Sequence, residues 1–155
     1  GNQQDGNIHL LAKTMKRTPI YPIIGDGNGL MQPIYAGDLA KVIVSTLKNE
    51  EITRNKEYDV AGKEPIKYKE LLYEISNAMN KKIYLLRIPY KLALIIGKIA
   101  DKIPNRFINY EKVLRLKEDK NFDYSDAIYD LGFNPISFKE GIKLEVEELK
   151  KNNII

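Results

Sequence analysis

The chain of 155 residues contains no cysteine, no tryptophan and a single histidine, His9. Without cysteine it can form no disulfide, carries no thiol nucleophile and offers no thiolate to a metal ion. One histidine likewise excludes every site that needs two imidazoles. The absence of disulfides is typical of a reducing compartment, and we expect a cytoplasmic protein.

Long hydrophobic runs and a strong charge of one sign are also absent. The longest uncharged apolar run in the second half, residues 92–97, is far shorter than the roughly 20 residues of a transmembrane helix, so we expect no membrane span. The 25 basic and 21 acidic residues give a net charge of +4. Lysines alternate with glutamates, which argues against nucleic-acid binding.

The chain begins with Gly1 and a turn-forming run over residues 1–7, without a targeting pattern. We therefore expect a piece of a longer protein.

Apolar spacing predicts a mixed α/β or α+β domain, mostly helical with a few short strands. The predicted helices cover residues 8–17, 39–47, 71–79, 92–103, 109–116 and 138–151, and a further short helix opens within residues 123–127 and is closed by Gly132. The predicted strands cover 20–24, 57–62 and 83–86. Pro22 lacks an N–H and is predicted to place its strand at a sheet edge.

Two of these helices are unusually apolar. In the 39–47 helix apolar residues cover most of the circumference, which predicts burial on more than one side, and Asp38 is the expected N-cap. The 92–103 helix has one aliphatic face. We interpret that face as core or an internal contact, with a partner subunit or a membrane surface as the alternative.

The glycines at 25, 27 and 29 do not make a dinucleotide fingerprint, because Leu30 stands where a third glycine belongs and no helix follows directly. We expect a tight turn with positive φ angles instead. His9 is expected to be structural. No serine lies in a Gly-x-Ser-x-Gly elbow, and no pair of carboxylates is placed to catalyse hydrolysis.

Four motifs together resemble the extended short-chain dehydrogenase/reductase family, which includes the NAD-dependent epimerases and dehydratases of nucleotide sugars. They are the Gly-Asp-Gly turn at 25–27, Gln-Pro-Ile-Tyr-Ala-Gly-Asp-Leu-Ala at 32–40, a strand ending at Gly62 with Ile-Lys-Tyr-Lys-Glu-Leu-Leu at 66–72, and the stretches 123–135 and 138–142. They follow the family's order over nearly the whole chain.

The resemblance implies that residues 1–155 are one carboxy-terminal substrate-binding region of a Rossmann-type epimerase. The family's Gly-rich loop and catalytic Tyr-x-x-x-Lys belong to an amino-terminal cofactor domain that this chain lacks, and none of its ten tyrosines has lysine four positions later. NAD or NADP is therefore expected to bind the full-length parent and not this chain. Alone, the chain should not catalyse.

The residues that the resemblance places toward a nucleotide-sugar substrate are Asn7, Gln32, Tyr35 and Arg115. Each has a structural alternative: a helix cap for Asn7, strand surface for Gln32 and Tyr35, and a solvated charge for Arg115. The family's common Arg-Asp pair is replaced by Met31-Gln32, and its usual histidine by Tyr35. These departures resemble an atypical branch that includes epimerase-like proteins of polysaccharide gene clusters and non-catalytic subunits of respiratory complexes.

Two functions follow as expectations. The first is substrate binding in a nucleotide-sugar epimerase or dehydratase of polysaccharide or cell-envelope metabolism. The alternative is a non-catalytic interaction module. In the resembled family the 39–47 helix packs against the cofactor domain, so without that domain we expect a homo-oligomer.

Overall fold

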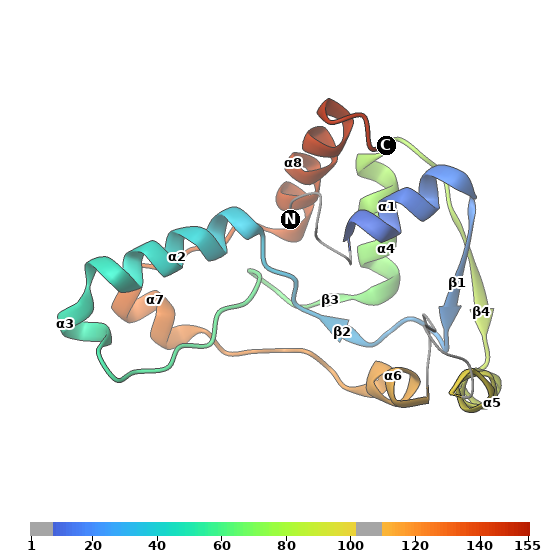
Figure 1. Ribbon diagram of the computed structural model, residues 1–155, viewed down its shortest axis with the longest axis horizontal. Coiled ribbons are helices and arrows are strands. Elements are labelled where there is room, and N and C mark those ends of the chain that lie inside the picture. The colour runs from blue at the N-terminus through green and yellow to red at the C-terminus, as the bar shows by residue number, and fades with distance from the viewer. Residues whose placement is uncertain (1–7, 102–109) are drawn as a thin grey trace.

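The computed structural model describes residues 8–101 and 110–155. The chain has a mixed architecture in which helices predominate and the strands are short (Figure 1). In chain order the elements are α1 (Ile8–Arg17), β1 (Ile20–Ile24), β2 (Leu30–Met31), α2 (Ala36–Lys48), α3 (Glu50–Thr53), β3 (Ile66–Lys67), α4 (Tyr68–Ala78), β4 (Tyr84–Ile88), α5 (Tyr90–Ala100), α6 (Tyr110–Leu114), the 3-10 helix η1 (Arg115–Lys117), α7 (Ser125–Leu131) and α8 (Phe138–Lys151).

The main hydrophobic core lies among α1, α4, α8 and β1. Each helix contributes its apolar stripe, which is why the residues predicted to point inward from α8, Ile142, Val146 and Leu149, are buried. Leu72 and Ile75 of α4 are inaccessible to solvent. A second, smaller cluster forms between α2, α7 and Phe133.

Two small sheets connect these helices. β1 and β4 pair in parallel from Ile20 opposite Tyr84 to Ile24 opposite Ile88, whereas β2 and β3 are antiparallel. Among the described residues β1 has a single neighbouring strand. The edge position predicted for the strand of Pro22 is thereby confirmed.

The ends of α7 and α8 follow the expected capping chemistry. Gly132 ends α7 in the left-handed region at φ 63°. Ser137 begins α8 with a capping box, in which its hydroxyl accepts from the Glu140 amide and the Glu140 carboxylate accepts from the Ser137 amide.

The predicted cap of α2 is wrong. The helix begins at Ala36 with Tyr35 as its N-cap residue, and Asp38 lies inside the first turn. The Asp38 side chain is buried and accepts from the Ile136 amide (2.9 Å) and the Lys41 ammonium (3.0 Å). This carboxylate joins α2 to the segment before α8 because a buried polar group needs such partners.

The predicted burial of α2 on more than one side is also wrong. Val42 packs into the second cluster, but Ile43 and Val44 are about half exposed and Leu47 is 74% exposed. One apolar face of α2 therefore has no partner among the described residues.

Residues 57–62 do not form the predicted strand. Within the described part of the chain their backbone has one backbone hydrogen bond, from the Gly62 amide to the Gln32 carbonyl (3.3 Å). Tyr58 and Val60 pack against the second cluster, as the alternating pattern requires. The pattern of a strand is present, but a neighbouring strand is not.

The aliphatic face of α5 is not part of the core formed by the described residues, so the core part of its interpretation is wrong. The small residues Ala93 and Gly97 face inward, whereas Leu92, Ile95, Ile96 and Ile99 are 40–60% exposed. Small side chains allow α5 to lie close to α6, which runs beside it (Figure 1). The predicted end of this helix lies outside the described residues.

Candidate functional site

A cavity lies beside the glycine turn that follows β1. We call it the turn pocket; its volume is about 480 Å³, within the size range of small-molecule sites. It is lined by Ile24, Gly25, Asp26, Gly27, Gly29, Leu30, Met31, Tyr68, Tyr90, Arg115, Leu116, Glu118 and Lys120.

The turn itself has the expected backbone conformation. Gly25 and Gly27 have φ angles of 72° and 69°, which confirms the positive values predicted for these glycines. The Asp26 carboxylate accepts from the Asn28 amide (3.0 Å) and from its side-chain nitrogen (2.6 Å). These hydrogen bonds, led by the one from the backbone, lower the pKa of Asp26 and keep it ionised.

Carbonyl groups of the turn accept hydrogen bonds from the first amides of α4. The Gly27 and Gly29 carbonyls accept from the Lys69 and Tyr68 amides, each at 3.0 Å. A Cβ atom at Gly27 would come within 3.0 Å of Lys69 Cβ, so a side chain is poorly tolerated there. The turn therefore serves as one wall of the pocket.

The segment from η1 to Lys120 also lines the pocket. The Leu30 amide donates to the Asp119 carboxylate (2.9 Å), and the Lys120 amide donates to the Leu30 carbonyl (3.0 Å). These contacts bring Arg115 and Lys120 to the pocket although they lie far from the glycine turn in sequence.

Arg115 and Lys120 are the basic residues that line the turn pocket. Arg115 forms an ion pair with Glu118, with 3.7 Å between Nε and Oε2, and both side chains are more than 60% exposed. Such an exposed and long ion pair contributes little free energy. The guanidinium is therefore available for an anionic ligand such as a diphosphate.

Tyr68 lies on the inner wall and is hydrogen-bonded to Tyr21. Burial, together with the neighbouring phenol, raises the pKa of Tyr68 well above its ordinary value, and burial raises the pKa of Tyr21 as well. Both phenols stay protonated at neutral pH. They can donate hydrogen bonds but do not act as bases.

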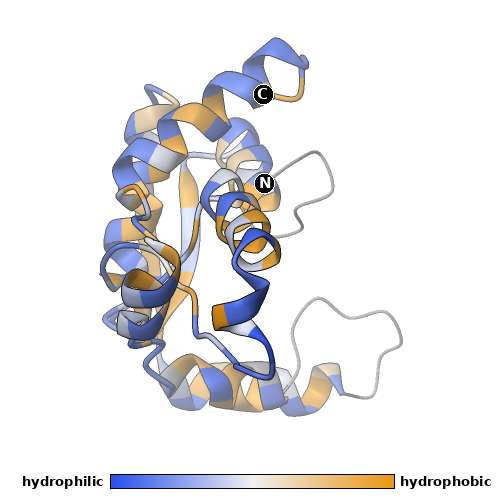
Figure 2. Ribbon diagram, turned by 90° about the vertical axis from the view of Figure 1, so that its left-hand side faces the viewer, coloured by the Kyte–Doolittle hydropathy of each residue, from blue (hydrophilic) through white to orange (hydrophobic). Residues whose placement is uncertain are grey.

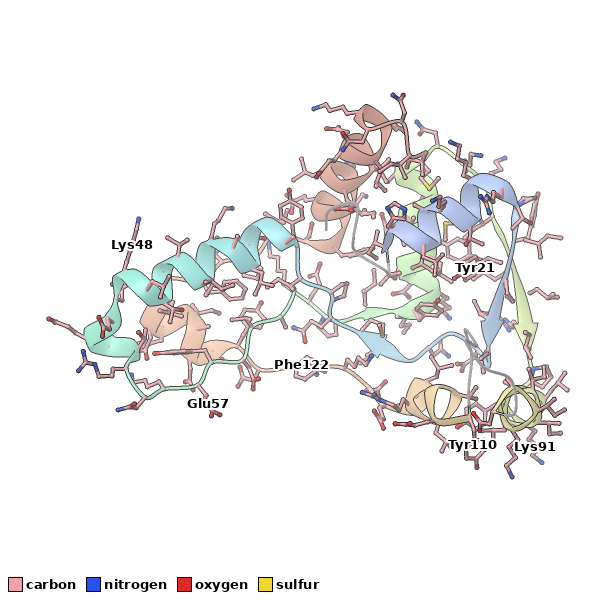
Figure 3. All side chains as sticks on the ribbon, viewed as in Figure 1. Tyr21, Lys48, Glu57, Lys91, Tyr110 and Phe122 are labelled. Carbon is pink, nitrogen blue, oxygen red and sulfur yellow. The ribbon has the colours of Figure 1, made fainter. Side chains whose placement is uncertain are left out.

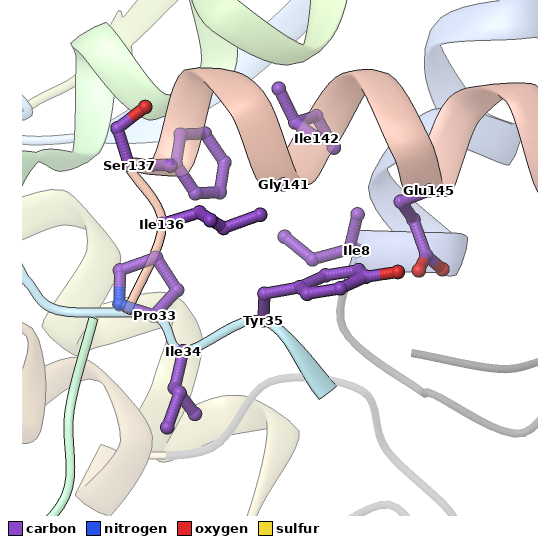
Figure 4. A pocket seen from close by; sticks show the side chains of 10 residues that line it. Ile8, Pro33, Ile34, Tyr35, Ile136, Ser137, Gly141, Ile142 and Glu145 are labelled. Carbon is purple, nitrogen blue, oxygen red and sulfur yellow. The ribbon is translucent and has the colours of Figure 1, made fainter. Parts of the chain in front are cut away.

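A second, smaller cavity of about 50 Å³ lies between α8 and the start of α2 (Figure 4). Tyr35 lines it, and its hydroxyl end points toward the carboxylate of Glu145 (Figure 4). The other lining residues are mainly aliphatic. This volume is too small for a sugar.

The predicted substrate residues lie in different places. Arg115 lines the turn pocket and Tyr35 the smaller cavity, so the structure does not bring them together. Gln32 lines neither cavity: its Nε2 donates to the Gly62 carbonyl (2.9 Å), and its Oε1 accepts from the Phe122 amide (2.6 Å). The predicted site residue Asn7 lies outside the described residues.

Sequence reasoning did not select Tyr68, Tyr90, Lys120 or the glycine turn as pocket residues. The turn was recognised, but nothing in its local pattern shows that the segment 115–120 folds back beside it. The described residues include no cluster of three or more potential metal-ligating side chains. In the same ranges no helix is long and apolar enough to cross a bilayer.

No family model matches the sequence. The chain is similar to an N-acetyl-alpha-D-glucosaminyl-diphospho-ditrans,octacis-undecaprenol 4-epimerase of Escherichia coli O157:H7, with 24% identity over 99% of this chain and 49% of that protein. It is also similar to the mitochondrial NADH dehydrogenase [ubiquinone] 1 alpha subcomplex subunit 9 of Arabidopsis thaliana, with 25% identity over 59% of this chain and 23% of that protein. The chain thus spans half or less of the curated relatives it matches.

Solved structures give the same picture. The UDP-glucuronic acid 4-epimerase of Bacillus cereus, in complex with NAD, matches 97% of this chain and 41% of its own length at a TM-score of 0.66 and 18% identity. The dTDP-glucose 4,6-dehydratase of Bacillus anthracis, also with NAD, matches 94% and 39% at 0.61 and 14% identity. RMD from Pseudomonas aeruginosa, complexed with NADPH, matches 98% and 44% at 0.64 and 12% identity. The chain has the fold of the carboxy-terminal region of the Bacillus cereus epimerase and the Bacillus anthracis dehydratase, as its sequence motifs predicted.

Proposed function

We propose that the chain is the substrate-binding region of an NAD-dependent epimerase or dehydratase, and that its turn pocket binds a nucleotide-linked sugar. The single observation that carries the proposal is the position of Arg115, whose guanidinium lies at a cavity of about 480 Å³ beside the glycine turn. A diphosphate is a natural partner for an exposed guanidinium. Polysaccharide or cell-envelope sugar metabolism is the proposed setting.

Part of the pocket's chemistry suits the sugar. Tyr68 contributes a protonated phenol, and Tyr90, at the start of α5, contributes aromatic surface. Lys120 provides a second cation in the pocket lining. The nucleotide sugars and the polyprenol-linked sugar of the Escherichia coli relative share a sugar joined to a diphosphate, which is the feature that Arg115 and Lys120 would recognise.

We further propose that the catalytic step belongs to an amino-terminal Rossmann domain of the parent protein. The unpaired segment 57–62 and the exposed face of α2 lie on the same arm of the molecule and would be completed by an additional sheet (Figure 1). This chain would bind and orient the sugar, while NAD or NADP in the other domain would accept and return the hydride. Alone, residues 1–155 should not bind the dinucleotide.

Calorimetric titration of the full-length protein with UDP-, GDP- and dTDP-sugars tests the pocket. Arg115→Ala should weaken the affinity for the preferred ligand by about tenfold or more, because a charge-assisted hydrogen bond is lost. Arg54→Ala is the matched control, since Arg54 is an exposed arginine of the same ion-pair type, paired with Glu50 away from the pocket. Unchanged affinity in Arg115→Ala would refute the assignment.

A second function, a non-catalytic interaction module, is favoured by one observation: the aliphatic residues of α5 are exposed instead of buried. The residues encoded upstream of Gly1 discriminate between the two. A Gly-rich loop followed by Tyr-x-x-x-Lys favours the enzyme, whereas a loop without that tyrosine favours the module.

A further inference from the structure

The outward face of α5 is a contiguous aliphatic surface. Leu92, Ile95, Ile96 and Ile99 are all exposed, with Ile99 at 60%. At 3.6 residues per turn these four positions fall within one arc of about 100° on the helix. An exposed apolar surface of this kind marks a place of interaction.

Lysines border this arc on one side. Lys91 and Lys98 follow each other two turns apart along the helix, and both are exposed. The Lys98 ammonium also lies 5.1 Å from the centre of the Tyr110 ring of α6. Figure 3 shows Lys91 and Tyr110 at the end of the molecule formed by α5 and α6.

Within α5 the charge has one sign. Lys91 and Lys98 are its charged residues, and the next carboxylate along the chain is Asp101, just after α5. Exposed aliphatic side chains beside cations are typical of helices that lie in the headgroup region of an anionic bilayer.

The α5 surface is separate from the other unpartnered apolar face. α2 lies at the opposite end of the long axis of the molecule (Figure 1), and the apolar segments at the lower edge of Figure 2 belong to the α5 end.

Charge also argues against a second copy of the chain as the occupant. In a two-fold symmetric pair the same patch meets itself, so a second copy would bring two more lysines and no carboxylate of α5 to the contact. An anionic lipid surface instead complements these lysines. We propose that α5 rests on the surface of an anionic membrane, with its aliphatic arc among the headgroups and its lysines on lipid phosphates.

The position of Tyr90 gives this docking a consequence. Tyr90 is the first residue of α5 and lines the turn pocket, so membrane contact would hold the pocket close to the lipid surface. The docking proposal itself does not depend on the function proposed for that pocket.

Sedimentation of the chain with vesicles tests the proposal. One set of vesicles contains phosphatidylcholine alone and the other contains phosphatidylcholine with phosphatidylglycerol. The chain should bind the second set and be released by high salt, because salt screens the lysine–phosphate attraction. The double variant Ile95→Ser/Ile99→Ser should lose about tenfold or more in binding, since two exposed aliphatic anchors are removed.

The matched control is Ile43→Ser/Leu47→Ser, which removes two exposed aliphatic residues from α2 and should leave vesicle binding unchanged. Lys91→Glu should weaken binding without affecting the fold. Circular dichroism of each variant verifies that helix content is retained. The nucleotide-sugar affinity of the α5 variant should stay at the unsubstituted value, which separates failure of docking from failure of the pocket assignment.

Three results would overturn the proposal. One is equal binding to both sets of vesicles, and another is full binding by Ile95→Ser/Ile99→Ser. The third is an oligomer that this variant dissociates while neither protein binds vesicles, which would assign the surface to a second copy.

Discussion

Asp130 lies in α7 and connects this helix to the segment after α3 by hydrogen bonds between side chains. Its carboxylate accepts from the Lys56 ammonium and the Tyr58 hydroxyl, each at 2.7 Å. These hydrogen bonds, led by that from Lys56, lower the pKa of Asp130, and the same contact raises the pKa of Lys56. The folded state therefore favours the ionised form of both groups.

The sign of the pH dependence follows from these shifts. A carboxylate with a lowered pKa adds stability above its unfolded value, near 3.9, and that stability is lost as the pH falls through the lower folded value. We expect Asp130→Asn to be less stable than the unsubstituted chain at neutral pH, with the difference vanishing in strong acid. Urea unfolding over a pH series measures this difference, and a difference that persists unchanged into strong acid would contradict the assignment.

Single residues also show where sequence reasoning was sufficient. Gly132 and Ser137 lie at helix ends whose chemistry is local, so the end of α7 and both ends of α8 were predicted correctly. Asp38 is a residue type that often caps helices, but its carboxylate accepts hydrogen bonds from the Ile136 amide, far along the chain, and from Lys41. Its position inside α2 depends on tertiary contacts that local sequence does not contain.

At the scale of elements, the capping box at Ser137 should set the stability of α8. Ser137→Ala removes the acceptor of the Glu140 amide and should lower the free energy of unfolding by about 1 kcal/mol. Ser137→Thr keeps a hydroxyl and should recover most of that loss. Denaturant unfolding of the two variants provides the comparison, and equal stability of both would show that the box contributes nothing.

The apolar helices α2 and α5 show what an amphipathic pattern can predict. The pattern predicts that a helix forms, but not which of its apolar residues are buried. The period of α5 correctly predicted a helix, but whether Ile95 or Gly97 faces inward depends on α6, whose close approach requires small residues. In α2 the pattern has two apolar sides, and among the described residues only the side of Val42 has a partner. Residues 57–62 follow the same rule, because a strand needs a neighbour as well as a pattern.

The candidate site was predictable only in part. Arg115 lines the pocket. It was selected as a site residue because of the resemblance to epimerases, and no local sequence signal would have identified it. Tyr68 and Lys120 were missed because β2 brings them together through hydrogen bonds on both of its sides. Such long-range pairing has no signature in a single sequence.

At the scale of the whole molecule, the exposed face of α2 predicts self-association. Ile43, Val44 and Leu47 leave apolar surface in water, which is unfavourable by roughly 25 cal/mol per Å². We expect light scattering of residues 1–155 to find a dimer or a larger species, and Ile43→Ser/Leu47→Ser to shift it toward monomer. A strict monomer with a cooperative thermal transition and no binding of a hydrophobic dye would show that the chain closes its own core.

The hydrogen bonds around the glycine turn have a thermodynamic consequence. The turn is fixed by Asp26 and Asn28 and by the first amides of α4, while Leu30 is fixed by Asp119. The pocket wall is therefore ordered before any ligand arrives, and association loses little conformational entropy there. On binding, the group that loses most conformational freedom should instead be the long, exposed side chain of Arg115. The conformational entropy lost on association should therefore come mainly from this one side chain and not from folding of a loop.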